Sequence, residues 1–398
     1  MKDKPIERLI KAEQLRQKKV INLIASENYV SADVLAALGS ELNNKYAEGY
    51  PGARYYGGNE VVDQVESFCR ERALKLFKLP AKKWQVNVQP LSGSPANLAV
   101  YLALVPPGGK VMGMSLAHGG HLTHGHKASA TGKFFQPIPY EVNKETEMID
   151  YDEVEKLAVK EKPAIIVAGY TAYPRKIDFK RFRQIADKVG AYLMVDMSHF
   201  AGLVAGGAFP SPFPYADIVT TTTHKTLRGP RAAMIFSHQD ERELGKKIDK
   251  AVFPGLQGGP HINQIAGVAV ALGEASLPAF KKYATQVVKN TKALGQELQR
   301  LGWRVISGGT DSHLILVDTW MTGVGLGGKE ASESLEKVGI IINKNAIPFD
   351  SRSPVDPSGV RMGMAAETTR GAKEAKAKMI AQKIDKVWRQ QLKNKVNN

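Results

Sequence analysis

The chain has 398 residues, of which 43% are hydrophobic and 24% are charged, and its formal net charge is +16. This is an ordinary globular composition, and the length exceeds what one core usually supports, which predicts two domains and an arm. No stretch approaches the roughly 20 apolar residues of a membrane span and no apolar signal region opens the chain, so we expect a cytoplasmic protein without a membrane partner.

Residues 1–35 predict an N-terminal arm, because helix formers of mixed charge open the chain without the pattern of a core element. Glycine and tyrosine crowd residues 46–58, which predicts a loop that lines a site or an interface. Within it, Glu48 lies among tyrosines and is a candidate general acid and base, or else an acceptor that stabilises the loop. Cys69 is the only cysteine, which excludes an internal disulfide, and we expect it to pack on a helix over 61–76.

Residues 36–275 predict a large α/β domain, and residues 276–398 predict a smaller α+β domain that begins with a long helix. In the first segment short β-rich runs alternate with helical patterns, which is typical of a mostly parallel sheet covered on both faces. The expected strands lie at 86–88, 111–114, 164–168, 192–196, 218–222 and 233–237. Ligands of such sheets bind beyond the carboxyl ends of the strands.

Two patterns in the first half of the chain suggest ligand contacts. Ser92, Gly93 and Ser94 join a short strand to an alanine-rich helix, so hydroxyls and free N–H groups form a cup for phosphate, although such residues also cap helices that bind nothing. Histidines recur from His118 to His126, as in zinc sites. We expect no metal, because the glycines beside His121 indicate a loop that lets a ring approach a flat ligand, and no HExxH pattern is present.

Asp196 and Lys225 each follow a β-rich run. A buried carboxylate requires a cationic partner, and the protonated nitrogen of a pyridine ring would supply one, unless Asp196 caps the next helix or forms an internal ion pair. An amine at a strand end can be desolvated and crowded by positive neighbours, which lowers its pKa and exposes the neutral nucleophile that an aldehyde requires. The pair predicts a Schiff-base lysine and an electron-sink cofactor, with a solvated surface lysine as the alternative.

Arg361 is the candidate for binding a substrate carboxylate, because its planar fork suits bidentate capture, although isolated arginines often form surface salt bridges. Beyond it, lysines accumulate between 373 and 395. Apolar residues recur there at helical spacing, which predicts an amphipathic helix with a solvated basic face. We therefore expect anionic small molecules, and not nucleic acid, to be the partners of this basic chain.

The chain resembles serine hydroxymethyltransferase, a family of pyridoxal-phosphate enzymes with the aspartate-aminotransferase-like fold. Matching segments occur in the family's order at 23–29, 44–52, 54–58, 117–125, 223–225, 257–260, 307–311 and 343–345. The resemblance implies a mostly parallel seven-stranded sheet with a smaller C-terminal α+β domain and an N-terminal arm. The chain departs from the family at Met364 and Ala365, where Thr-Pro is usual. Proline would stiffen the loop behind Arg361, so its loss is expected to loosen substrate selectivity without abolishing binding.

The resemblance also implies an activity and a set of site residues. The activity is the reversible conversion of L-serine and tetrahydrofolate into glycine and 5,10-methylenetetrahydrofolate, with pyridoxal 5'-phosphate as cofactor, in a homodimer or a dimer of dimers. The implied catalytic residues are Lys225, Glu48, Asp196, His121 and Thr223. The implied cofactor contacts are Ser92, Gly93, Ser94, His121, Thr171, Asp196, His199, His224 and Lys225, with Tyr46, Gly258 and Gly259 from a second subunit. Ser26, Tyr56 and Arg361 would bind the amino acid, and Glu48, Tyr55, Leu116, Gly120, Leu122 and Asn345 would bind folate.

Two alternatives remain open at this stage. The nearer one keeps the cofactor and omits folate, as in an aldolase acting on threonine or other β-hydroxy amino acids. The more distant one is a basic RNA-binding protein on an enzyme's scaffold, which predicts RNA binding that depends steeply on salt.

Overall fold

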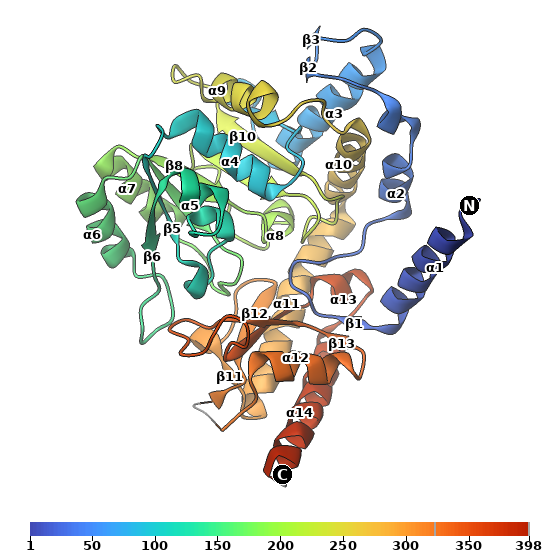
Figure 1. The fold of residues 1–398 in the computed structure, drawn as a ribbon, viewed down its shortest axis with the longest axis vertical. Coiled ribbons are helices and arrows are strands. Elements are labelled where there is room, and N and C mark those ends of the chain that lie inside the picture. Colours follow the sequence, from blue (N-terminus) through green and yellow to red (C-terminus); the bar gives the residue numbers. More distant parts are fainter. Residues whose placement is uncertain (322–323, 397–398) are drawn as a thin grey trace.

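The computed structural model describes residues 1–321 and 324–396, and a seven-stranded sheet lies at the centre of its larger part (Figure 1). The strands are β4 (Trp84–Asn87), β5 (Lys110–Met114), β6 (Gln136–Tyr140), β7 (Ile165–Gly169), β8 (Tyr192–Asp196), β9 (Ile218–Thr222) and β10 (Ala233–His238). Their order is β4-β10-β9-β8-β7-β5-β6. β10 runs antiparallel to both of its neighbours, and the other pairs are parallel. The predicted mostly parallel sheet is confirmed.

Of the seven strands of this sheet, only β6 was not predicted from the sequence. It contains Pro137 and Pro139, and proline is unfavourable in a central strand because it lacks a backbone N–H. In the structure β6 is the edge strand and pairs with β5 alone. One side of an edge strand makes no ladder hydrogen bonds, so the prolines are tolerated there.

Helices cover both faces of this sheet, because successive residues of each strand point to opposite sides. Leu193 and Val195 of β8 belong to one core, and Met194 between them belongs to the other. The first core also contains α3 (Glu60–Leu76), α6 (Tyr151–Glu161), α7 (Phe179–Val189), α8 (Ala201–Ala205) and α10 (Ile262–Ala275). The second contains α4 (Gly93–Leu104) and α9 (Leu244–Lys250), with α5 (Ala130–Phe134) nearby. Cys69 is fully buried on α3, as expected.

A second, smaller sheet has the order β11-β12-β15-β14 and is antiparallel throughout. Its strands are β11 (Arg304–Val305), β12 (Leu314–Asp318), β14 (Asn343–Asn345) and β15 (Gly359–Gly363), and its helices are α12 (Gly328–Glu336), α13 (Ala365–Thr369) and α14 (Glu374–Val396). We call this part the small lobe and the part around the seven-stranded sheet the large lobe. The two lobes share α11 (Pro278–Arg300), which packs its first turns in the large-lobe core and its last turns in the small-lobe core. The domain limits at 275 and 276 stay a prediction.

The first residues form an arm, as Figure 1 shows. Helix α1 (Lys4–Lys19) buries none of its side chains, and Asp3 caps it by accepting a hydrogen bond from the N–H of Ile6. The chain then adds β1 (Ile21–Asn22) to β13 (Ile340–Ile341) of the small lobe, and α2 (Ala32–Leu38) packs on α10. A hairpin of β2 (Gly49–Tyr50) and β3 (Ala53–Arg54) follows at the far edge of the large lobe. Short helical turns occupy Glu41–Asn44, Leu116–His118, Leu122–His124, Ala251–Leu256 and Ile306–Gly308.

Among the described residues, no helix combines the length and the apolar character needed to cross a bilayer.

Candidate active site

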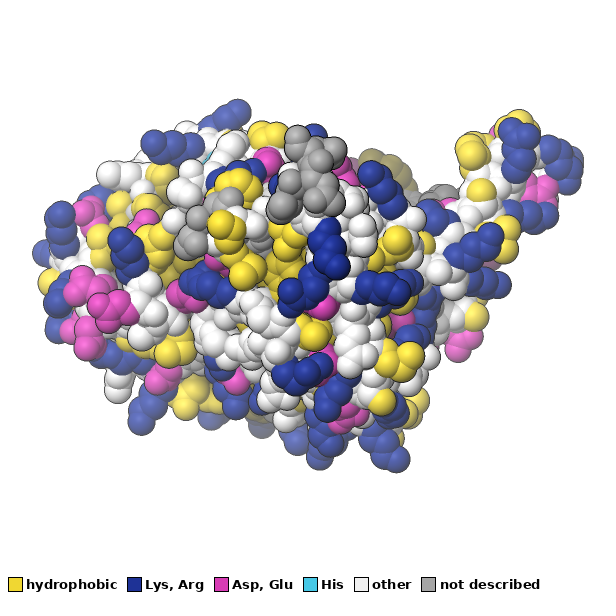
Figure 2. Space-filling view, turned by 90° about the horizontal axis from the view of Figure 1, so that it is seen from below, with side chains coloured by type: hydrophobic (Ala, Val, Ile, Leu, Met, Phe, Trp, Pro, Cys, Tyr) yellow, Lys and Arg dark blue, Asp and Glu magenta, His cyan; other side chains and the backbone are white. Residues whose placement is uncertain are grey.

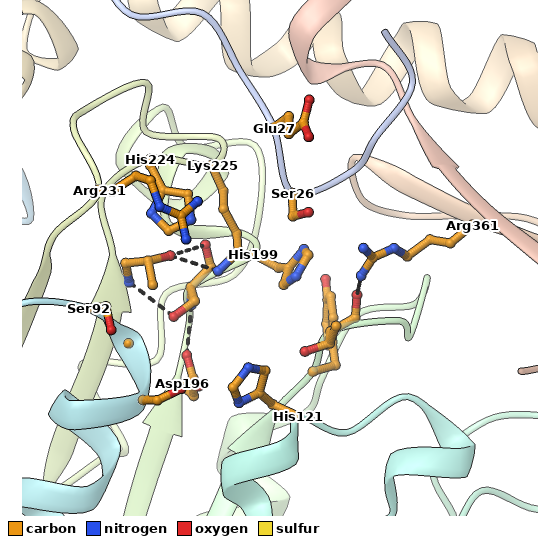
Figure 3. A pocket seen from close by; sticks show the side chains of 16 residues that line it. Ser26, Glu27, Ser92, His121, Asp196, His199, His224, Lys225, Arg231 and Arg361 are labelled. Carbon is orange, nitrogen blue, oxygen red and sulfur yellow. Dashed lines mark hydrogen bonds between the residues drawn. The ribbon is translucent and has the colours of Figure 1, made fainter. Parts of the chain in front are cut away.

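A cavity of about 330 Å³ lies beyond the carboxyl ends of β7, β8 and β9, between the two lobes (Figure 3). This is the edge at which open parallel sheets bind their ligands. Eleven of the residues singled out in the sequence line it: Ser26, Ser92, Gly93, Ser94, His121, Thr171, Asp196, His199, His224, Lys225 and Arg361. Glu27, Tyr170, Ser198, Thr222 and Arg231 complete the wall.

Lys225 projects into this cavity from the segment after β9. Its Nζ donates a hydrogen bond to Oγ1 of Thr222 at 2.9 Å. Burial lowers the pKa of Lys225 to about 8; Asp196 opposes the shift, and the positive charges of Arg361 and Arg231 add to it. A large fraction of the amine is therefore neutral and nucleophilic near pH 8, which is the environment expected for an amine at a strand end.

Asp196 ends β8 and is 6% exposed. Its Oδ2 accepts hydrogen bonds from Nδ2 of Asn97 at 2.9 Å and from Nε2 of His124 at 3.1 Å, and its Oδ1 accepts one from the N–H of Ser198 at 3.0 Å. Burial alone would raise the pKa of Asp196, but the hydrogen bond and the charge of His124 hold the pKa below its usual value. The carboxylate stays ionised and can stabilise a protonated ring nitrogen.

The start of α4 offers hydroxyl and N–H groups that can bind an anion. Ser92 precedes the helix and its side chain makes no capping bond there. Gly93 has no room for a side chain, because a Cβ would lie 2.7 Å from Cγ2 of Thr222. Figure 3 shows His224 and Arg231 close to each other on the same wall as Ser92. Among the described residues Arg231 has no hydrogen-bond or ion-pair partner, so this wall presents an uncompensated positive charge beside a helix N-terminus.

Arg231 was not among the predicted site residues. Its sequence signal is weak, because an arginine after a Gly-Pro pair reads as part of a surface turn. The turn itself directs it into the cavity: the N–H of Gly229 donates to the carbonyl of Thr223 at 2.7 Å, which folds the segment back over Lys225.

Arg361 enters the cavity from β15 of the small lobe and is 7% exposed. Its Nη1 donates to the carbonyl of Thr171 at 2.7 Å, and its Nε donates to Oδ1 of Asn343 at 3.1 Å. Burial lowers the pKa of Arg361 to about 10. No carboxylate of the described residues pairs with it, so the surface salt bridge considered above is absent and a bound carboxylate would supply the missing charge. Met364 nearby is buried in the small-lobe core.

The four clustered histidines face different partners. His121 lines the cavity, its Nδ1 lies 2.8 Å from Oγ1 of Thr123, and burial lowers the pKa of His121 to about 4, so the ring is neutral. His124 contacts Asp196, His118 packs against Phe349, and Nδ1 of His126 accepts a hydrogen bond from the N–H of Ala128 at 3.2 Å. No group of three His, Cys, Asp or Glu side chains within residues 1–321 and 324–396 is arranged to hold a metal ion. Gly120 keeps this loop against β5, because a Cβ there would lie 1.9 Å from the carbonyl oxygen of Met114.

The other predicted residues lie outside this cavity. Tyr46, Glu48, Tyr55 and Tyr56 surround the β2–β3 hairpin, and Gly258 and Gly259 pack beside them: Cβ atoms on the two glycines would lie 3.3 Å from Oε1 of Glu48 and 3.2 Å from the ring of Tyr46. We call these six residues the hairpin cluster. Leu116 and Leu122 are exposed on either side of the loop that carries Gly120 and His121, and Asn345 lies on β14.

Thr223 is 1% exposed and its hydroxyl donates to the carbonyl of Pro230 at 2.6 Å, so Thr222 supplies the hydroxyl that contacts Nζ of Lys225.

The cavity at the carboxyl edge of this mostly parallel sheet contains a buried amine, an ionised carboxylate and the N-terminus of a helix. This site and this fold are those of the class of pyridoxal-phosphate-dependent transferases. The family model described as serine hydroxymethyltransferase matches residues 1–384. The chain therefore belongs to the serine hydroxymethyltransferase family, as its motifs indicated.

Several curated relatives carry the name serine hydroxymethyltransferase. The protein of Desulfotalea psychrophila is 54% identical over 385 residues, which cover 97% of this chain and 88% of the relative. The protein of Koribacter versatilis is 56% identical over 378 residues, which cover 95% and 87%. The protein of Coprothermobacter proteolyticus is 55% identical over 386 residues, which cover 97% and 91%.

Proposed function

We propose that the chain catalyses the reversible transfer of the hydroxymethyl group of L-serine to tetrahydrofolate, with pyridoxal 5'-phosphate held by Lys225. The observation that carries this proposal is that one cavity contains a desolvated lysine amine, a buried carboxylate and a buried arginine that pairs with no carboxylate of the described residues. Membership of the serine hydroxymethyltransferase family, at 54% to 56% identity with curated members, supports the reaction.

The residues of the cavity fit the proposed cofactor. Ser92, Gly93, His224 and Arg231 would hold its phosphate, since they offer free hydroxyl, N–H and cationic groups, and the buried Nδ1 of His224 has no hydrogen-bond partner among the described residues. Asp196 would hold the ring nitrogen. When bound, the cofactor supplies an aldehyde for the lysine amine and a ring that withdraws electrons from the substrate.

Other side chains of the cavity would bind the substrate and orient the reacting amine. Arg361 would bind the carboxylate of the amino acid and so orient the bonds of its α-carbon for the electron-withdrawing chemistry that the cofactor supplies. Thr222 accepts a hydrogen bond from Nζ of Lys225 and orients the amine. His121 is neutral and presents a flat ring to the cavity without adding charge.

A homodimer or a dimer of dimers, with the site shared between copies, belongs to the proposal. The hairpin cluster supports this assembly, because none of its six residues lines the cavity of its own chain. The hairpin is nevertheless well anchored, since Arg54 donates hydrogen bonds to the carbonyls of Ala47 and Gly49 and pairs with Glu66. Tyr55 at its tip is 76% exposed. An ordered aromatic patch that faces solvent is typical of a surface that another molecule covers.

The arm supports the same assembly. Apolar side chains of α1 are exposed, including Ile6, Leu9, Ile10 and Leu15, and the helix contributes none of them to either core. Figure 2 shows the arm extending from the body. Such a helix gains stability when its apolar side chains pack against another chain.

Folate is proposed as the acceptor, with Glu48 as general acid and base and Tyr55, Leu116, Gly120, Leu122 and Asn345 around it. The folate-free aldolase remains the nearest rival. An assay of proton exchange at the α-carbon of glycine separates the two: tetrahydrofolate should accelerate the exchange in a folate-dependent enzyme and leave an aldolase unaffected.

Nucleic acid is not part of the proposal. Figure 2 shows Lys and Arg spread over the visible face with Asp and Glu among them, which favours a solvated surface over a binding stripe. A cytoplasmic location is proposed with the function, because the single buried Cys69 suits a reducing compartment.

The direct test is chemical. Borohydride reduction of the protein loaded with pyridoxal phosphate, followed by peptide mass mapping, should place a pyridoxyl group on Lys225. An adduct on another lysine, or none, contradicts the assignment.

A further inference from the structure

A pair of buried imidazoles joins the two lobes beside the cavity. His199 follows β8 in the large lobe and lines the cavity, and His313 immediately precedes β12 in the small lobe. Nδ1 of His199 lies 3.1 Å from Nε2 of His313, the ring centroids are 5.3 Å apart, and the residues are 3% and 0% exposed. We propose that His313 is a positioning residue, which fixes the ring plane and the tautomer of His199 and thereby what Nε2 of His199 offers to the cavity.

The pair must hold one proton between the two facing nitrogens. A hydrogen bond between two neutral imidazoles requires an N–H on one side and a lone pair on the other. Both rings are neutral, because burial, with the positive charges of Lys225 and Arg361, lowers the pKa of His199 well below its usual value and that of His313 to about 3. A neutral imidazole carries a single N–H, so the state of Nδ1 in His199 determines whether its Nε2 donates or accepts.

Nothing else among the described residues holds the ring of His199 by a hydrogen bond. Its backbone is fixed, because the carbonyl of His199 accepts from Oγ1 of Thr226 at 2.9 Å, next to Lys225. The side-chain torsions are not fixed by that bond. The contact with His313 therefore fixes the orientation of the His199 ring. Without this contact the ring can flip and exchange its tautomers.

The position of His313 links this effect to substrate binding. β12 pairs with β15, which places Leu316 opposite Arg361, and the N–H of Met364 donates to the carbonyl of His313 at 3.3 Å. One small sheet therefore delivers both the carboxylate-binding arginine and the partner of His199. The contact that orients His199 therefore forms only when the small lobe is docked on the large lobe. Arg361 reaches the cavity in the same arrangement.

The inference rests on the proposed function, because it assigns His199 a working position in that cavity. The matched variants His313→Gln and His313→Asn test it. The amide of glutamine reaches the place of Nε2, and the amide of asparagine is one methylene shorter and does not. Both variants keep a polar amide in the same buried position, so a general loss of stability affects both. The difference between the two variants therefore reports the positioning role. His238→Gln is the control, since His238 ends β10, packs against the ring of Trp84 and does not line the cavity.

Two readouts are needed. The first is the long-range ¹H–¹⁵N correlation spectrum of the histidine rings in protein without cofactor, which reports tautomers directly. We expect one tautomer of His199 in the wild type, in His313→Gln and in the control, and exchange between tautomers in His313→Asn. The second is steady-state transfer kinetics, where His313→Asn should lower kcat at least about tenfold while KM for serine changes less than about threefold, and His313→Gln should recover most of kcat.

Equal behaviour of the two variants overturns the inference, whether both keep a single tautomer and full kcat or both lose them. A wild-type protein that transfers nothing from serine in the presence of both cofactor and tetrahydrofolate contradicts the proposed function instead. The spectrum of the cofactor-free protein still decides on the positioning role in that case.

Discussion

Lys225 should lower the free energy of unfolding of the protein, and its replacement by methionine measures the size of this effect. Lys225 keeps its amine in a cavity shared with Arg361 and Arg231, where burial and those charges disfavour the protonated form. Methionine has a similar length and no charge. In the protein without cofactor, we therefore expect Lys225→Met to be more stable than the wild type at pH 7, although it abolishes activity.

The size of the gain follows from the pKa shift. A pKa of about 8 in place of 10.5 disfavours the protonated amine by about 3 kcal/mol, at about 1.4 kcal/mol per pH unit. The hydrogen bond from Nζ to Thr222 offsets about 1 kcal/mol, and partial exposure of the side chain screens part of the remainder. The expected gain for Lys225→Met at pH 7 is therefore about 1–2 kcal/mol.

The gain should also depend on pH in a defined direction. Between pH 8 and pH 10.5 the unfolded chain still binds a proton at Lys225 and the folded chain has released it. Because the unfolded state then binds more protons, the stability of the wild type rises with pH across this interval. The advantage of Lys225→Met is thus complete below pH 8 and disappears as the pH approaches 10.5.

Urea unfolding of the cofactor-free proteins at a fixed protein concentration, at pH 7, 8, 9 and 10, measures this difference. Lys180→Met is the matched control, because Lys180 is an exposed lysine on α7 and its replacement should change stability by less than about 0.5 kcal/mol. If Lys225→Met is no more stable than the wild type at pH 7, or if its advantage does not shrink as the pH rises, the amine is not desolvated and the reasoning fails.

Three further predictions address the proposed site. Arg361→Lys should raise KM for serine about 10- to 100-fold, because a point charge replaces a bidentate fork, while the absorption spectrum of the loaded enzyme without substrate stays unchanged; a spectrum that changes and a KM that does not would place Arg361 on the cofactor instead. Asp196→Asn should lower kcat at least about 100-fold in the transfer assay, since the amide cannot stabilise a protonated ring nitrogen, and near-normal turnover would remove Asp196 from its role. Mixing inactive Lys225→Ala with inactive Glu48→Gln, with exchange of subunits, should restore activity at about a quarter of the sites if two copies share each site, and no recovery would confine Glu48 to the site of its own chain.

The sequence by itself determined the strand ends that carry the chemistry. An apolar run at 191–195 marks β8, because a strand buried on both faces of a sheet leaves few polar positions, and the β-branched residues Ile218–Thr222 mark β9. Asp196 at the end of one run and Lys225 just after the other therefore pointed to one edge of a parallel sheet, and the structure brings both into the same cavity. Long motifs in the order of the family then limited the reaction to one class.

Other features depended on contacts that no local pattern records. β6 forms although it contains Pro137 and Pro139, because the sheet places it at an edge. Arg231 becomes a cavity residue through the fold of its turn, and His313, which reads as an ordinary strand residue, meets His199 at a sequence separation of 114. Sequence patterns report which face of an element is apolar, whereas the partner of a polar side chain is decided by how the elements pack.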